Sequence, residues 1–207
     1  VAHGGKVRIL ACHYHFLADV GEDLLKEPHG RLRDLFRKSK VRPKLRDLVR
    51  NLGRKLGEEI SEVRQGVLDW QTMPDPGHHL PDGDDGVGVV RALAQWILDY
   101  PIESTGEDFP FVLPYLDLFD RCNILRRAID AFSRTPPTDP TVRRTLRRLA
   151  RILDKIQGDV LFRRTTTVLR RRAALFGELR DALRLTQEER PSDPPSIEEV
   201  QDVEKAI

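Results

Sequence analysis

A cysteine and two histidines near the start of the chain are the residues best suited to chemistry. Cys12, His13 and His15 follow an apolar run at residues 7–11, so a thiol and an imidazole stand three positions apart in a C-x-x-H step. Both side chains are zinc ligands, and both carry protons. The step is therefore a candidate metal-binding or catalytic motif at the end of a short predicted strand.

Three roles stay open for this motif. A tetrahedral zinc site needs four ligands, and the further candidates by residue type are His3, His29 and Cys122. However, no second C-x-x-C or H-x-x-H pair completes a local set. A Cys–His nucleophile pair lacks a recognisable third group that would orient the base. The remaining role is structural, with a thiol and an imidazole that pack behind a strand and hydrogen-bond to the backbone.

Basic side chains repeat at helical spacing in the C-terminal half of the chain. Arg143, Arg147 and Arg151 recur four residues apart and so share one helix face. Like charges at this spacing repel one another, which favours an anionic partner such as DNA phosphate, and the guanidinium group binds phosphate in a bidentate way. The candidate nucleic-acid-binding residues are Arg143, Arg144, Arg147, Arg148, Arg151, Lys155, Arg163, Arg164, Arg170, Arg171 and Arg172.

A solvated helix face, or docking against an acidic part of the same chain, would also account for these basic residues. The net charge of +2 conceals −9 over residues 71–120 and +11 over residues 121–184. Such an asymmetry indicates a partner of opposite charge, external or internal. Aromatic residues are scarce beside the arginines, which disfavours a stacking platform for single strands.

A segment at residues 71–86 that is rich in His and Asp offers a second group of metal-binding residue types. Its Asp-Gly-Asp-Asp-Gly run lacks the spacing and the final Glu of an EF-hand. The Gly, Pro and Asp content predicts a flexible acidic loop instead, with no metal site. The residues concerned are Asp75, His78, His79, Asp82, Asp84 and Asp85.

Two segments carry a family resemblance. Residues 12–17 read Cys-His-Tyr-His-Phe-Leu, and residues 113–122 read Leu-Pro-Tyr-Leu-Asp-Leu-Phe-Asp-Arg-Cys. The first resembles a segment of DDE-type transposases with an RNase H-like core, because Mutator-like and hAT transposases carry a C-x-x-H step shortly after their second catalytic Asp. The second resembles a helical segment further along such chains. The resemblance covers mainly residues 7–36 and, more weakly, residues 110–130.

This resemblance implies metal-dependent cleavage and transfer of DNA strands, with acidic residues that hold two Mg²⁺ ions. Residues 1–11 contain no Asp or Glu. The first two catalytic acids are therefore expected upstream of Val1, and the chain is expected to be a catalytically incomplete fragment with no cofactor evident of its own. Glu103 and Glu107 are the candidates for a later acid, and the alternative is that both are solvated loop carboxylates.

The elements that would position these residues are helices. Hydrophobic residues make up 39% of the chain and charged residues 33%. This balance is typical of helices with one buried stripe and a wide solvated face. We predict a mainly α protein, a multi-helix bundle of five to seven helices with at most a short N-terminal β-strand. The expected helices are 15–38 with a break near Pro28, 43–70, 87–99, 111–133, 141–157 and 160–185.

We expect three parts in the chain. The first part, residues 1–40, is a strand plus helix segment that bears the C-x-x-H step. The second, residues 41–186, is a helical domain with an acidic loop region at 71–110, and the third, residues 187–207, is a mobile acidic tail. Two distant cysteines and the lack of a long apolar run favour a cytoplasmic location without membrane contact.

We expect the chain to bind DNA through the phosphate backbone, as the helical portion of a DDE-type transposase-like protein, and self-association stays open. One alternative is an intracellular helical module for protein–protein interaction. The other is a small metal-binding protein that uses Cys12, His13 and His15.

Overall fold

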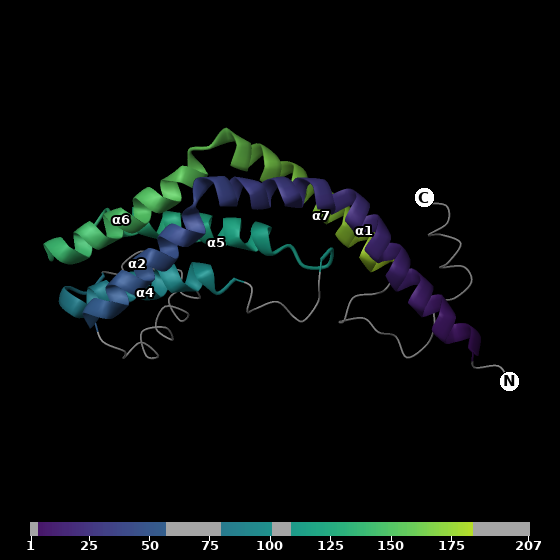
Figure 1. Cartoon of the computed structure of the whole chain (residues 1–207), viewed down its shortest axis with the longest axis horizontal. Helices are drawn as coiled ribbons and strands as arrows, with labels where there is room; N and C mark the ends of the chain where they lie inside the picture. Colours follow the sequence, from purple (N-terminus) through teal and green to yellow (C-terminus); the bar gives the residue numbers. More distant parts are fainter. Residues whose placement is uncertain (1–3, 57–79, 101–108, 184–207) are drawn as a thin grey trace.

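The computed structural model describes residues 4–56, 80–100 and 109–183, and side chains are described from residue 14 onward. Helices and short connections account for all of this part of the chain, which confirms the predicted mainly α bundle (Figure 1). The helices are α1 (Gly4–Ser39), α2 (Val41–Leu56), α4 (Gly83–Leu98), α5 (Pro114–Phe132), α6 (Pro140–Gln157) and α7 (Val160–Ala182).

The helices are arranged in two groups with α5 between them. α1 lies along α7, while α2 pairs with α4, and α6 packs on α4, α5 and α2. In Figure 1 the α1–α7 pair extends to the right, and α2, α4 and α6 gather at the left. One apolar core runs through both groups, because each helix turns a stripe of Leu, Ile, Val or Phe toward its neighbours.

The predicted N-terminal strand at residues 7–11 is wrong, because these residues lie inside α1. A run of five apolar and basic residues has no clear period and is compatible with either structure. A strand needs a neighbouring strand for its backbone hydrogen bonds, and the described residues contain none. Extension of a helix that already exists forms one new hydrogen bond per residue, so the helix prevails.

The predicted break near Pro28 is also absent, since α1 passes through this residue without interruption. Proline removes one backbone hydrogen bond inside a helix. On either side of it, however, Leu25, Leu32 and Phe36 are almost completely buried against the rest of the bundle. Their burial requires a continuous helix axis and outweighs the lost bond. The chain turns instead at Lys40, which adopts a φ of 55° between α1 and α2.

The starts of α4 and α6 are tied to each other by two aspartates. Asp139, which caps the start of α6, accepts hydrogen bonds from the backbone N–H of Thr141 (2.5 Å) and of Gly83 at the start of α4 (3.1 Å). In return, Asp82 accepts from the N–H of Asp139 (2.8 Å) and from the Thr138 hydroxyl. This cross-brace begins α4 at Gly83, four residues before the expected start.

Candidate nucleic-acid interface

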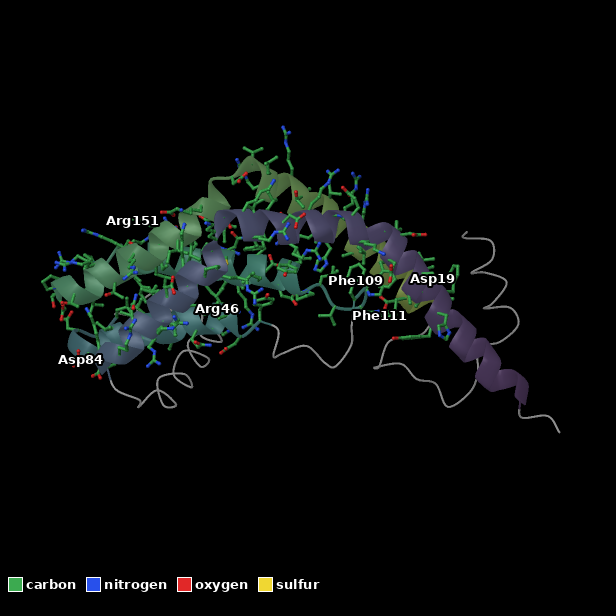
Figure 2. The ribbon with its side chains drawn as sticks, in the orientation of Figure 1. Asp19, Arg46, Asp84, Phe109, Phe111 and Arg151 are labelled. Carbon is green, nitrogen blue, oxygen red and sulfur yellow. The ribbon has the colours of Figure 1, made fainter. Side chains whose placement is uncertain are left out.

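Helix α6 separates its charged and apolar residues onto opposite faces. Its inner face consists of Val142, Leu146, Leu149, Ile152, Leu153 and Ile156, all buried. Its outer face carries five exposed basic residues, which we call the α6 stripe: Arg144, Arg147, Arg148, Arg151 and Lys155. Figure 2 shows Arg151 at the outer edge of α6, away from α2 and α4. The core face positions the helix, and the stripe is left to solvent.

The charge of the α6 stripe is not compensated by carboxylates in the described part of the chain. The nearest acid on the same helix, Asp154, accepts a hydrogen bond from Nε of Arg126 on α5, at 2.7 Å. Arg143, also predicted to bind nucleic acid, donates through Nη2 to the carbonyl of Thr138 at 2.7 Å and so belongs to the helix start. None of the five stripe residues has an ion pair with another described residue.

A second basic element extends the α6 stripe onto α2. The side-chain amine of Lys44 lies close to that of Lys155 on α6. This contact lowers the pKa of Lys44, and smaller contributions come from desolvation and from repulsion by Lys155 and Lys40. Two amines held this close favour the binding of an anion between them, because the anion relieves their repulsion.

Sequence reasoning missed a further basic row on α2. Arg46, Arg50 and Arg54 are exposed and stand four residues apart, the same spacing that marked Arg143, Arg147 and Arg151. Arg54 donates to the side-chain oxygen of Asn51 at 2.7 Å. The four-residue spacing of these arginines is visible in the sequence, but the apolar residues of the same segment form a longer and more regular repeat.

On α7 the predicted nucleic-acid-binding residues divide into two sets. Arg170 is paired with Asp120 of α5 and lies over the Phe119 ring. Arg172 donates to the carbonyl of Leu24 on α1 at 3.0 Å. Arg163, Arg164 and Arg171 are exposed and have no ion pair with another described residue. Internal docking on acidic residues therefore accounts for some of the α7 arginines but not for the α6 stripe.

The C-x-x-H residues lie on a helix. Cys12, His13 and His15 all belong to α1, and of these only His15 has a described side chain, which is exposed beside the Tyr14 ring. The zinc, nucleophile and packing roles of the Cys12 and His13 side chains therefore stay predictions. Across the described residues, no group of three or more His, Cys, Asp or Glu is placed to hold a metal ion.

The two other candidate ligands in the described part are packed among apolar groups. The His29 ring stacks on Phe109, with centroids 5.2 Å apart, and also contacts Tyr115 (Figure 2 labels Phe109). Burial lowers the pKa of His29 to about 4, with a smaller contribution from the charge of Arg33. Cys122 is a free thiol buried in α5, and burial raises its pKa well above the ordinary value. Both therefore stay uncharged at neutral pH in their packed positions.

The remaining acidic and histidine candidates fall partly inside and partly outside the described ranges. Asp82 belongs to the cross-brace, and Asp84 and Asp85 are exposed in the first turn of α4, where carboxylates interact favourably with the helix dipole (Figure 2 labels Asp84). The candidates outside the described residues are His3, Asp75, His78, His79, Glu103 and Glu107. The acidic tail at 187–207 also lies outside them.

Comparison of the chain with protein-family models, with curated proteins and with solved structures finds no match. Within the described ranges, no helix combines the length and apolar character that a membrane crossing requires. Function is therefore inferred from the residues and geometry of the chain itself.

Proposed function

We propose that this chain binds duplex DNA through the phosphate backbone, with the α6 stripe as the principal contact. The observation that carries the proposal is the row of exposed basic residues from Arg144 to Lys155, which lacks carboxylate partners in the described part of the chain. Side chains on this face have no role in the core. Their mutual repulsion costs free energy that an anionic partner recovers.

The dimensions and chemistry of the stripe suit a duplex. From Arg144 to Lys155 the helix rises about 16 Å, which corresponds to about five base-pair steps along the duplex axis. Arginine matches phosphate oxygens in a bidentate way, so these contacts hold the backbone without reading the base sequence. The outer face of α6 has no aromatic residue for base stacking, which favours duplex over single-stranded DNA.

We further propose that the chain is the helical portion of a DDE-type transposase-like protein and is catalytically incomplete alone. The support is the resemblance of residues 12–17 and 113–122 to such proteins. In this arrangement the helices hold DNA while acids elsewhere carry Mg²⁺ and the strand chemistry. The carboxylates of the described residues form no group of three or more that could hold Mg²⁺. A cytoplasmic setting, with Cys122 kept reduced, belongs to the same proposal.

The test is the salt dependence of binding to a fluorescein-labelled duplex of mixed sequence, followed by fluorescence anisotropy. We expect affinity to fall steeply between about 50 and 200 mM salt. The variant Arg144→Gln/Arg147→Gln/Arg151→Gln should weaken binding and reduce the slope of log affinity against log salt by about three, one per lost phosphate contact.

The matched control removes three basic charges from α1. Lys26, Arg31 and Arg37 are exposed but each is paired with an acid on the same helix. Their replacement by Gln changes the net charge by the same amount as the α6 variant. Because it removes no proposed phosphate contact, the salt slope should stay close to that of the parent. Equal losses of duplex affinity in the two triple variants would mean that net charge, and not the α6 stripe, determines binding. Absence of duplex binding by the parent chain at low salt would contradict the proposal.

A helical module for protein–protein interaction is the second candidate, and one observation favours it. Leu161, Val168 and Leu175 are large apolar residues that α7 exposes to solvent. Exposed apolar rows of this kind mark surfaces that bind other helices. The two candidates separate on the same duplex titration, because an interaction module without DNA affinity shows no binding at low salt.

A further inference from the structure

Helix α7 carries two parallel apolar rows, and only one of them is used by the described fold. Phe162, Leu169 and Phe176, seven residues apart, are buried against the bundle. One position before each of these stands a member of a second row, Leu161, Val168 and Leu175, with exposed fractions of 57%, 43% and 54%. Because seven residues are close to two helical turns, the second row forms one line along the outside of α7.

Two basic residues accompany this open row, which we call the outer row of α7. Arg164 and Arg171 are also seven residues apart, are exposed, and have no ion pair within the described part of the chain. A complementary partner is therefore an amphipathic helix with apolar residues on one side and carboxylates beside them. A second copy of α7 fits poorly, because antiparallel pairing about the row would bring the arginines of the two copies together.

The chain itself contains a segment with the required pattern. Residues 196–207 read Ser-Ile-Glu-Glu-Val-Gln-Asp-Val-Glu-Lys-Ala-Ile, with four acids and one base. Ser196 and Glu199 have the spacing of a capping box, which predicts a helix start at this point. The apolar residues Ile197, Val200, Val203 and Ile207 recur at helical spacing. The segment lies outside the described residues, so this helix is a prediction from sequence.

The segment is long enough to cover most of the outer row of α7. The outer row of α7 rises about 21 Å from Leu161 to Leu175, and an eleven-residue helix at 197–207 would be about 16 Å long. The connection at residues 183–196 can extend to about 46 Å, far more than the distance of about 10 Å from Leu175 to the end of α7. An antiparallel return of the segment onto α7 is therefore sterically accessible.

We propose that the outer row of α7 is the docking site for residues 196–207 of the same chain. The apolar side of the segment covers Leu161, Val168 and Leu175, and its carboxylates lie beside Arg164 and Arg171. The docked segment neutralises basic charge on α7 and leaves the α6 stripe open. This contact is independent of nucleic acid, so it stands or falls separately from DNA binding.

The test measures the reactivity of a single cysteine placed in the outer row. In the full chain with Cys12→Ser, Leu175→Cys or Leu161→Cys is the reporter, and Ala131→Cys on α5 is the exposed control. The buried Cys122 thiol does not compete. We expect both reporters to react several-fold more slowly than the control with an aromatic disulfide reagent. The tail substitutions Val200→Asp/Val203→Asp should raise both rates to that of the control.

The outcomes separate the occupants of the site. Slow reporters that are released by the tail substitutions, in a chain whose mass in solution is that of a monomer, support the proposal. Reporters that react as fast as the control with the tail intact would overturn it. Protection accompanied by a dimer mass would assign the site to a second copy instead. Circular dichroism of each variant verifies that the helices of the bundle are retained.

Discussion

Helices α6 and α7 are neighbours with similar arginine content, yet their basic residues have different roles. On α6 the basic residues Arg144 to Lys155 share one outer face without carboxylate partners in the described part of the chain. On α7, Arg170 pairs with Asp120 and Arg172 with the Leu24 carbonyl, while apolar residues occupy much of the outer face. Arginine content alone therefore does not distinguish the two helices; what differs between them is whether each guanidinium has a partner within the described fold.

The largest expected effect distinguishes the two apolar rows of α7. Phe162 is almost fully buried and meets the Phe36 ring edge-to-face, with centroids 5.0 Å apart. Phe162→Ala should lower the free energy of unfolding by about 3–5 kcal/mol. Leu161→Ala, one position away, removes a side chain that is 57% exposed in the described fold and that only the docked segment 196–207 would cover, so it should cost about 1 kcal/mol. Urea denaturation followed by circular dichroism measures both, and equal losses of unfolding free energy would contradict the assignment of Phe162 to the core and of Leu161 to the outer row.

A smaller effect tests the close approach of α1 to α7. A Cβ added at Gly21 would lie 2.8 Å from Cε2 of Phe176 on α7 and would meet the Pro110 ring. Gly21→Ala should therefore cost about 1–3 kcal/mol of unfolding free energy. Gly30→Ala is the control in the same helix, because nothing lies within 4 Å of the added atom. Gly30→Ala should stabilise the protein by about 0.5–1 kcal/mol. If Gly21→Ala proved more stable than Gly30→Ala, α1 and α7 would lie farther apart at Gly21 than described.

Acid should destabilise the packing of α1 on Phe109 and Tyr115 before it affects the start of α6. The pKa of His29 is lowered to about 4, chiefly by burial, so the folded protein resists a protonation that the unfolded chain accepts near 6.5. Stability from this residue is present above pH 6.5 and falls as the pH decreases toward 4. Melting temperatures at pH 7 and 4.5 should differ less in His29→Gln than in the parent. His15→Gln, at an exposed site, should behave like the parent; if His29→Gln does too, His29 is not the cause.

The start of α6 should respond only at lower pH. Hydrogen bonds from the Thr141 backbone to Asp139 and from the Thr138 hydroxyl to Asp82 lower the pKa of each carboxyl group. Their stabilisation is present above the unfolded value near 3.9 and is lost as the pH falls through the lower folded values. Asp139→Ala should reduce the melting temperature by a few degrees at pH 7 and by a smaller amount at pH 2. Asp19→Ala, at an exposed site on α1, should have little effect at either pH, and an equal loss there would contradict the cap.

Helical periodicity predicted most of the fold. The expected helix at 141–157 differs from α6 by one residue, and the expected helix at 160–185 shares its start with α7. The strand at 7–11 failed because the described residues offer it no neighbouring strand, whereas the break near Pro28 failed because burial of Leu25, Leu32 and Phe36 requires a continuous helix. Of the helix expected at 43–70, the described part ends at Leu56.

The candidate site was predicted in part. The spacing of Arg147 and Arg151 was sufficient to place both on one helix face. It could not reveal that Arg170 meets Asp120, 50 residues away, or that Arg172 meets Leu24, 148 residues away. Pairing over such separations follows from the tertiary arrangement of the helices. The basic row on α2, in contrast, was accessible from spacing alone.

The most direct test compares one unpaired arginine with one paired arginine in the same protein. Arg147→Gln and Arg170→Gln remove identical groups, and duplex affinity is measured by anisotropy at several salt concentrations. We predict that Arg147→Gln weakens binding and lowers the salt slope by about one, while Arg170→Gln leaves the slope unchanged. Equal slopes for both variants, or a loss confined to Arg170→Gln, would contradict the assignment of the α6 stripe as the DNA-binding surface.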